Sequence, residues 1–219
     1  MRGGILIIAL LAGMGLRGNA VAEDAPIRPD DLVARVQAFY DRTTDYKASF
    51  RQVVTTAHPA RTFTRSGTVY FKRPGMMRWD YKVPDEVYYV SDGDVLWSYE
   101  VEEGVAYRLD LGGSELAYAL RFLSGSARLK DDFTPAVGTP AASGRVPLAL
   151  TPRTPQGNFK MVTLFVDPKT GETGETQVVD PQGNVSRVSF DGPSFKPLPR
   201  DGFTFKPPEG VRVQDVGPR

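Results

Sequence analysis

Apolar residues near the start of the chain follow the spacing of an amphipathic helix. They fall at positions i, i+1, i+4, i+7 and i+8 and are Leu32, Val33, Val36, Phe39 and Tyr40. This spacing places them in one stripe along a helix. Asp30 or Asp31 stands at the start of the stripe, where a carboxylate can accept hydrogen bonds from free backbone N–H groups. The pattern predicts a helix at about residues 31–43, with its apolar stripe on the core.

Nearly all of the chain after this helix has the sequence pattern of β-strands. Some segments alternate apolar and polar residues with a two-residue period, and others are runs of β-branched and aromatic residues. Turn sequences rich in Asp and Gly separate the alternating segments, as at 91–94, 167–171 and 180–184. Asp and Gly favour these positions because they tolerate the backbone angles of tight turns. The predicted strands are 46–54, 68–72, 76–81, 87–90, 95–101, 105–111, 148–151, 161–166, 176–179, 185–190 and 203–205.

Two segments interrupt the β pattern. Leu116, Leu120 and Leu123 are spaced four and three residues apart, which predicts a short helix over 115–123. Residues 134–147 are rich in Pro, Gly, Ala and Ser and are predicted to form a loop. The chain shows neither a fixed-period repeat nor a long linker, so we expect one domain. A barrel or a strongly curved sheet would accommodate this many short antiparallel strands.

The first 22 residues have the pattern of a secretory signal peptide. Arg2 supplies a positive charge, residues 5–16 form an apolar run, and Ala20-Val21-Ala22 provides a small-x-small cleavage site. The run is shorter than the roughly 20 residues that a transmembrane helix needs. We therefore expect residues 1–22 to be removed and residues 23–219 to form a single exported domain, located in a bacterial periplasm.

Composition narrows the possible functions. The chain of 219 residues contains 27 basic and 26 acidic residues, for a formal net charge of +1. Duplex nucleic-acid binders need a surplus of cations, so nucleic acid is not expected as a partner. Cysteine is absent, which excludes disulfides, thiolate catalysis, cysteine-ligated zinc and a cysteine-linked lipid anchor. His58 is the single histidine and is predicted to lie in a loop, so we expect no metal site and no cofactor.

Catalytic patterns are missing as well. The carboxylate pairs at 85–86, 102–103 and 131–132 are adjacent in sequence, so on a strand their side chains would point to opposite faces. Each pair also stands near a turn signal. The chain has no Gly-x-Ser-x-Gly, no phosphate-binding loop and no His-Glu-x-x-His. The sequence therefore does not predict an enzyme.

Aromatic residues and methionines are concentrated in the first half of the predicted sheet. For any single one, a place in the core is the simplest interpretation. As a set they exceed what one small helix can cover, so a curved sheet could enclose an apolar cavity suited to acyl chains. Two methionines, Met76 and Met77, would add adaptable surface. The aromatic residues are Phe50, Tyr70, Phe71, Trp79, Tyr81, Tyr88, Tyr89, Trp97 and Tyr99.

Two motifs in this region resemble a known family. Residues 70–84 read YFKRPGMMRWDYKVP, and residues 90–99 read VSDGDVLWSY. Together they resemble the LolA family of periplasmic outer-membrane lipoprotein carriers. Weaker similarity covers 46–52, 148–152, 157–160 and 203–211, so the resemblance extends over nearly all of residues 23–219.

The resemblance implies a mainly β fold, an incomplete and strongly curved antiparallel β-barrel of about ten or eleven strands covered by a helical lid. It also implies a function. Carriers of this family bind acylated lipoproteins released by an inner-membrane ABC-type complex and deliver them to an outer-membrane acceptor, LolB or an equivalent. A monomer without cofactor and without catalytic residues is expected.

The resemblance also assigns roles to individual residues. Arg73 matches the family's arginine that hydrogen-bonds to the lid and holds it closed. The expected acyl-chain cavity residues are Phe50, Met77, Trp79, Tyr89 and Trp97. Of these, Met77 and Trp79 share strand parity, and Met77 stands where the family commonly has an aromatic residue. The lid would consist of helices 31–43 and 115–123, with Val33, Val36, Phe39, Leu116 and Leu120 on its inner side.

Other functions fit parts of the pattern. The outer-membrane acceptor shares the fold but is usually anchored through an N-terminal cysteine, which this chain lacks. Periplasmic lipid-sensing regulators of related fold carry an additional C-terminal domain for which the chain is too short. A related carrier of another acylated lipid or a glycolipid remains an alternative.

Overall fold

The computed structural model describes residues 27–111, 128–155, 157 and 159–216. The predicted signal peptide, 1–22, lies outside these residues. So does the predicted helix 115–123, with Leu116 and Leu120.

Helix α1 (Pro29–Arg42) confirms the helix predicted from the apolar stripe. Pro29 stands at its first turn, where the missing N–H of proline costs no hydrogen bond. Asp30 and Asp31 follow in that turn, where carboxylates are favoured by the helix dipole. Its buried residues are Leu32, Val33, Val36 and Phe39.

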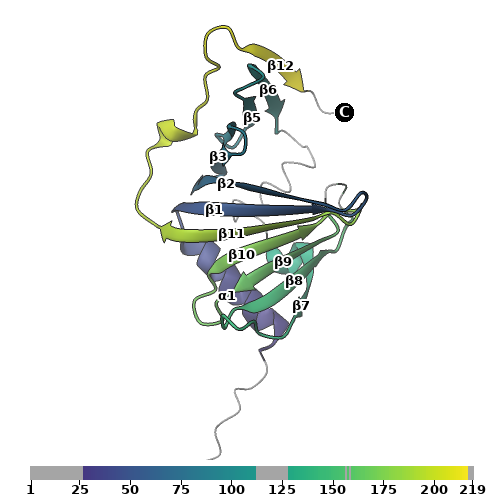
Figure 1. Cartoon of the computed structure of the whole chain (residues 1–219). Helices are drawn as coiled ribbons and strands as arrows, with labels where there is room; N and C mark the ends of the chain where they lie inside the picture. The colour runs from purple at the N-terminus through teal and green to yellow at the C-terminus, as the bar shows by residue number, and fades with distance from the viewer. Residues whose placement is uncertain (1–26, 112–127, 156, 158, 217–219) are drawn as a thin grey trace, which may run out of the picture.

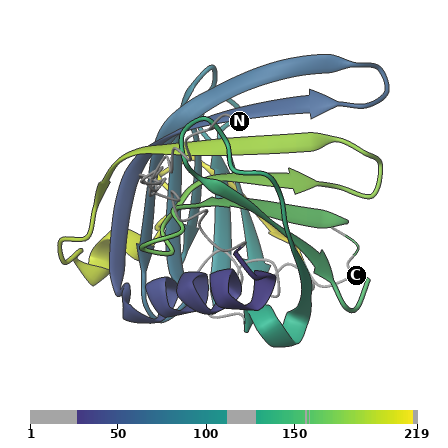
Figure 2. The ribbon, with the colours of Figure 1, turned by 90° about the horizontal axis from the view of Figure 1, so that it is seen from below.

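Apart from two short helices, the other elements that the structure describes form one sheet of twelve strands in the order β12-β6-β5-β4-β3-β2-β1-β11-β10-β9-β8-β7. All neighbours are antiparallel except β12 and β6, which are parallel. The sheet curves around α1, and its two edge strands are not paired with each other (Figures 1 and 2). This confirms the incomplete, curved antiparallel barrel, with twelve strands rather than ten or eleven. The strands are β1 (Asp45–Thr56), β2 (Arg61–Lys72), β3 (Met76–Val83), β4 (Val87–Ser91), β5 (Val95–Glu100), β6 (Val105–Asp110), β7 (Phe133–Val137), β8 (Val146–Pro152), β9 (Met161–Val166), β10 (Thr173–Val179), β11 (Val185–Ser194) and β12 (Arg212–Val216).

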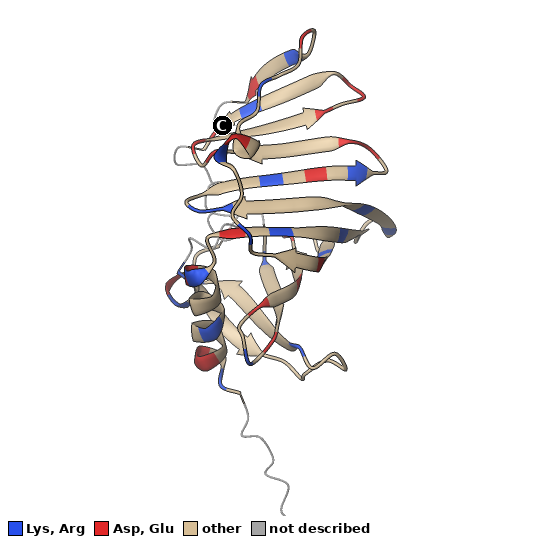
Figure 3. Cartoon of the chain, turned by 90° about the vertical axis from the view of Figure 1, so that its left-hand side faces the viewer, with Lys and Arg blue, Asp and Glu red and all other residues tan. Residues whose placement is uncertain are grey.

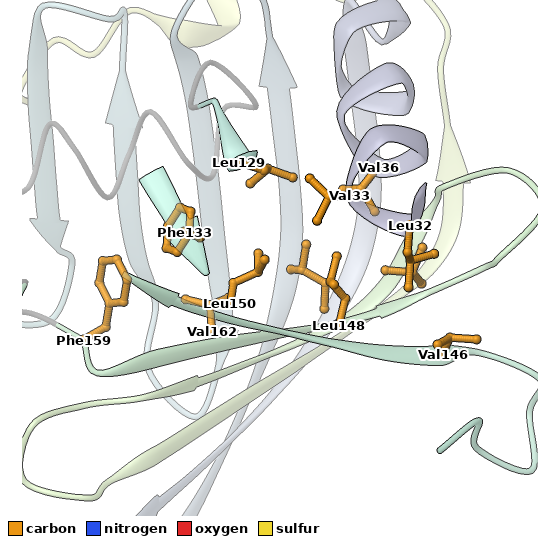
Figure 4. Close-up of a cluster of buried hydrophobic side chains, with 12 residues drawn as sticks. Leu32, Val33, Val36, Leu129, Phe133, Val146, Leu148, Leu150, Phe159 and Val162 are labelled. Carbon is orange, nitrogen blue, oxygen red and sulfur yellow. The ribbon is translucent and has the colours of Figure 1, made fainter. Parts of the chain in front are cut away.

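Two apolar clusters cover the inner face of the sheet, the face that α1 contacts. The helix-side cluster joins α1 to the half of the sheet that ends at β7 (Figure 4). Its members are Leu32, Val33, Val36, Leu129, Phe133, Val146, Leu148, Leu150, Phe159, Val162, Leu164 and Val166. The aromatic cluster lies mainly on β1–β6. Its buried members are Ala48, Phe50, Val69, Met77, Trp79, Tyr81, Leu96, Leu111 and Val188.

Strand register aligns the aromatic cluster across the sheet. Ala48 is opposite Val69, which is opposite Trp79. In the next row, Phe50 is opposite Gly67, which is opposite Tyr81. Gly67 is required here, because a Cβ at this position would lie 1.9 Å from the carbonyl oxygen of Asp80 and 3.0 Å from the Phe50 ring. The missing side chain lets the rings of Phe50 and Tyr81 approach to 4.9 Å between centroids.

The C-terminal segment crosses the outer face, which is the face opposite α1. A 3₁₀ helix, η1 (Arg200–Phe203), accepts a hydrogen bond at the Gly202 carbonyl from Nη1 of Arg78 at 3.1 Å. The chain then continues to β12, which pairs with β6. The predicted strand 203–205 is therefore wrong. Phe203 ends η1, and the next two residues belong to no strand.

The prediction of a loop over 134–147 is wrong at both ends of that range, because most of β7 and the start of β8 lie within it. Pro135 interrupts the strand signal, but an edge strand such as β7 tolerates proline because one side of it makes no ladder hydrogen bonds. The short helix α3 (Leu129–Asp132) and β12 were not expected. Every residue of β12 is exposed, so it lacks the alternation that marks a half-buried strand. Within the described ranges, no helix has the length and apolarity needed to cross a bilayer.

Candidate functional site

A cavity of about 80 Å³ lies on the inner face beneath the C-terminal end of α1. It is formed where the end of α1, the start of β1 and the end of β2 converge on β10 and β11. The lining residues are Phe39, Tyr40, Thr43, Thr44, Asp45, Tyr46, Phe71, Lys72, Arg73, Trp79, Thr173, Thr176 and Phe190.

Aromatic rings form the apolar wall of this cavity. The Tyr46 ring lies 6.1 Å from that of Phe71 and 6.2 Å from that of Phe190, measured between centroids. The Phe71 ring in turn meets Trp79 edge-on at 6.1 Å. These contacts make the cavity continuous with the aromatic cluster, so its lining is chemically suited to hydrocarbon.

Arg73 lies on the rim and connects β2 to α1. Its backbone N–H donates to the carbonyl of Thr44 at 2.8 Å. Its Nη2 lies 3.9 Å from Oδ1 of Asp41, in the last turn of the helix. A cation at this end of a helix is also favoured by the helix dipole. The arginine therefore contacts the helix that covers the cavity.

Asp45 and Lys72 form a second, more buried polar contact on the rim. Lys72 Nζ donates to Oδ1 of Asp45 at 2.7 Å, and the backbone N–H of Leu198 donates to the same oxygen at 3.0 Å. The hydrogen bond from Lys72 is the main reason that the pKa of Asp45 lies below its usual range, and the bond from Leu198 adds to it. Asp45 is therefore charged and paired at neutral pH.

The tyrosines of the cavity are neutral. Burial raises the pKa of Tyr46 well above its usual range, and the negative charge of Glu172 adds to the shift. Burial also raises the pKa of Tyr40, whose hydroxyl donates to Oγ1 of Thr173 at 3.4 Å. The interior of the cavity thus presents hydroxyls and rings, with its charges at the rim.

The structure brings most of the expected site residues together. Trp79 lines the cavity, and Phe50 and Met77 belong to the adjoining aromatic cluster. Tyr89 packs against that cluster and lies opposite Trp79. On α1, Val33 and Val36 pack in the helix-side cluster, while Phe39 lines the cavity.

Trp97 is the exception, because it lies on the outer face. Its neighbour Leu96 packs in the aromatic cluster, so the next side chain on the strand points the other way. The Trp97 ring lies 5.4 Å from that of Phe205, in the C-terminal segment. The expectation that Trp97 faces the cavity is therefore wrong. In the sequence, alternation shows only that Leu96 and Trp97 face opposite sides of the sheet, and packing decides which of them faces the cavity.

Several lining residues are not among the five expected cavity residues. Tyr46 and Phe71 share strand parity with Phe50 and Val69, which was a usable signal. Phe190 and Thr176 come from strands far along the chain and reach the cavity only through the β1–β11 and β10–β11 pairings. His58 lies in the exposed turn between β1 and β2, as predicted. Among the residues whose positions are described, no group of three His, Cys, Asp or Glu could hold a metal ion.

Comparison with known proteins gives a consistent result. The family model described as outer membrane lipoprotein carrier protein LolA matches residues 41–206. An outer-membrane lipoprotein carrier protein of Erwinia tasmaniensis is 27% identical over 187 residues, covering 84% of this chain and 88% of the relative. The outer-membrane lipoprotein carrier protein of Albidiferax ferrireducens is 31% identical over 188 residues, covering 81% of this chain and 88% of the relative.

Solved structures share the fold at low sequence identity. An uncharacterised conserved protein from Thermus thermophilus superposes with a TM-score of 0.54 at 12% identity, covering 85% of this chain and 98% of the other. At this identity the likeness concerns the fold alone.

Proposed function

The chain belongs to the LolA family of outer-membrane lipoprotein carriers, and we propose that it binds the acyl chains of lipoproteins released from the inner membrane and delivers them to an outer-membrane acceptor. The observation that carries this proposal is the apolar cavity between α1 and the inner face, continuous with the aromatic cluster.

The closed cavity is too small for this cargo. Its volume of about 80 Å³ is far below the roughly 300–1,000 Å³ of pockets that enclose a drug-sized ligand. Acyl chains would therefore enter only when the C-terminal end of α1 moves away from Tyr46, Phe71 and Trp79. Displacement of this end leaves Leu32 and Val33 in the helix-side cluster, so the helix can remain attached at its other end.

The energetics favour such exchange. Each methylene removed from water contributes about 0.8 kcal/mol, so free acyl chains are strongly unfavourable outside a carrier. When the helix lifts, apolar surface is exposed on the helix and the sheet, and bound acyl chains cover it again. Loading and release can then follow differences in affinity between successive partners, without fuel at the carrier itself.

Arg73 is proposed to act as the latch of this helix. Its guanidinium can bridge β2 to the last turn of α1 near Asp41, and a planar donor with several N–H groups suits such a contact. Loss of the latch would favour the open helix, so cargo would still be accepted but would be retained more strongly.

The remaining roles follow from the family and from the N-terminal pattern. The proposed partners are acylated lipoproteins, an inner-membrane ABC-type release complex and an outer-membrane acceptor such as LolB. Residues 1–22 would direct export to the periplasm and be cleaved. The carrier would act as a monomer, and it would act by binding rather than by catalysis.

A release assay tests the proposal. Residues 23–219 would be incubated with spheroplasts that synthesise a labelled outer-membrane lipoprotein, and soluble cargo in a one-to-one complex would be measured. We expect release. A Thr176→Phe variant, which fills the cavity, should release little, whereas Ser49→Phe, which adds the same ring on the exposed outer face, should behave as the wild type. No release by a folded wild-type protein, with a control carrier active, would reject the carrier function.

A further inference from the structure

The β1–β2 hairpin extends beyond its neighbour β3 and ends beside the β10–β11 turn (Figures 1 and 2). Strand β2 pairs with β3 only from Ser66 onward, so residues 61–65 pair with β1 alone. On its other side, β1 is paired with β11 as far as Thr55. Near the tip, β11 therefore supports the hairpin on the β1 side. On the β2 side, residues 61–65 pair with no further strand among the residues that the structure describes.

This hairpin is strongly basic. Residues 46–79 contain no Asp or Glu, and their basic residues are Lys47, Arg51, Arg61, Arg65, Lys72, Arg73 and Arg78. Toward the tip, Arg51, Arg61 and Arg65 are exposed, and none forms an ion pair with any residue the structure describes. Figure 3 shows basic segments and no acidic ones along the hairpin toward its tip.

Asp180, in the adjacent β10–β11 turn, forms hydrogen bonds within that turn. Asp180 accepts hydrogen bonds from the backbone N–H and from Nδ2 of Asn184, at 2.8 and 2.6 Å. Asn184 in turn accepts a bond from the backbone N–H of Ala57 at 2.9 Å. These bonds hold the hairpin against the neighbouring turn while leaving its arginines open to solvent.

Strand parity places an aromatic ring between two of the arginines. Arg61, Phe63 and Arg65 alternate along β2, and the same row continues through Gly67 to Val69 on the inner face. Phe63 is 48% exposed. The Arg65 guanidinium lies 6.0 Å from the centre of the Tyr81 ring, at the border of the aromatic cluster. The inner face thus ends in a projecting apolar residue flanked by two cations.

We propose that the hairpin tip, carrying Arg61, Phe63 and Arg65, docks reversibly on an anionic phospholipid surface. Guanidinium groups pair with lipid phosphates, and an exposed ring between them can enter the boundary between headgroups and acyl chains. A projecting tip suits a flat, anionic bilayer surface better than it suits a folded protein partner, for which a recessed or extended complementary surface would be expected.

Such docking would orient the protein. Because Arg61, Phe63 and Arg65 lie in the row of β2 that continues onto the inner face, contact at the tip would fix the orientation of that face relative to the bilayer, with the cavity at the other end of the two strands. The docking is argued from the hairpin alone, and its use in cargo transfer rests on the proposed function. Each cation near an anionic surface contributes about fivefold to partitioning, so the contact would be weak and reversible, as a carrier requires.

Vesicle binding tests the docking directly. Residues 23–219 would be sedimented with phosphatidylcholine vesicles that contain about 30% phosphatidylglycerol and with vesicles of phosphatidylcholine alone. We expect binding to the anionic vesicles only, weakening as salt rises. Arg61→Gln with Arg65→Gln should lower the partition coefficient by about tenfold or more, and Phe63→Ser by several-fold.

Matched controls separate the hairpin from the general surface. Arg153→Gln with Arg212→Gln removes the same charge from exposed positions elsewhere, and Val213→Ser removes an exposed apolar side chain of β12. Both should bind as the wild type does. Equal losses in the control pair, or unchanged binding in the hairpin pair, would overturn the proposal. In the second case, the arginines would serve only to protect the free strand edge from association.

The carrier function and the docking of the hairpin can be rejected independently of each other. Wild-type vesicle binding without lipoprotein release would reject the carrier function and leave the docking standing. Absence of wild-type vesicle binding would overturn the docking. If, in addition, the hairpin variants lost transfer to the acceptor, the hairpin would instead recognise an acidic protein surface.

Discussion

Lys72, the last residue of β2, donates a 2.7 Å hydrogen bond to Asp45, the first residue of β1, and closes the rim of the cavity where α1 meets the sheet. Their side chains are 17% and 8% exposed, so the pair is shielded from solvent. Since Asp45 also accepts from Leu198, one carboxylate connects the first two strands and the C-terminal segment.

Replacing this carboxylate should reduce stability in a pH-dependent way. The pKa of Asp45 is lowered in the folded protein, so its stabilising contribution is complete above the unfolded pKa of about 3.9 and is lost as the pH falls through the folded value. Asp45→Asn should therefore lower the free energy of unfolding by about 2 kcal/mol at neutral pH, and the difference should shrink below pH of about 4. Urea unfolding across pH measures this, with the exposed Asp201→Asn as control. A deficit that stayed constant into acid would contradict it.

Loss of Arg73 should impair transfer rather than loading. Because its ion pair with Asp41 is partly exposed and 3.9 Å long, removal should change global stability by less than about 1 kcal/mol. Arg73→Leu should still release lipoprotein from spheroplasts but pass it poorly to acceptor-containing membranes, since the open helix retains cargo. Arg200→Leu, an exposed arginine on η1, provides the comparison. Normal transfer by the Arg73 variant would remove its role as a latch.

Gly67 should be intolerant of even a methyl group. A Cβ there would lie 1.9 Å from a backbone oxygen, which cannot move aside as a flexible side chain can. We expect Gly67→Ala to destabilise the protein by about 2 kcal/mol or more. A Cβ at Gly202 would have no atom within 4 Å, so Gly202→Ala should change the unfolding free energy by no more than about 0.5 kcal/mol. Similar midpoints of thermal unfolding for the two variants would be the contrary result.

The two tryptophans should respond differently to ligand. Trp79 lines the cavity, whereas Trp97 packs against Phe205 on the outer face. In a Trp97→Phe variant, the remaining fluorescence should shift when an acylated ligand binds, and affinity should stay within about twofold of the wild type. In Trp79→Phe, the remaining Trp97 signal should be insensitive to ligand but should shift to the red when Phe205→Ala is added. A ligand response from Trp97 would contradict its assignment to the outer face.

Local patterns were sufficient for much of the fold. The stripe from Leu32 to Tyr40 predicts α1 because a helix is specified by contacts three and four residues apart. Alternation likewise predicts β1, whose residues 46–51 alternate between the buried inner face and the exposed outer face. Strand β7 and strand β12 were not predictable in this way. Pro135 disrupts the propensity of β7, and the exposed residues of β12 owe their conformation to pairing with β6.

The candidate site was predictable only in part. The motif around Arg73 and Trp79 identifies the strands that carry the cavity, since both residues belong to one continuous segment. It does not identify which face Trp97 occupies, because that depends on where the packed C-terminal segment lies. Nor does it identify Phe190 and Thr176, which are brought to Tyr46 because β1 pairs with β11, more than 100 residues further along the chain, and β11 pairs with β10.

Periodicity and composition thus established a β-rich chain with one amphipathic helix and no cysteine chemistry, and the motifs at 70–84 and 90–99 added a resemblance to a family of carriers. The order of the twelve strands, the closure of the cavity beneath α1, the buried Asp45–Lys72 pair and the projecting basic hairpin were decided by the tertiary structure. The physical reason is that spacing along a chain encodes which side of an element is apolar. Which elements those sides meet depends on long-range pairing and packing, for which local sequence carries little information.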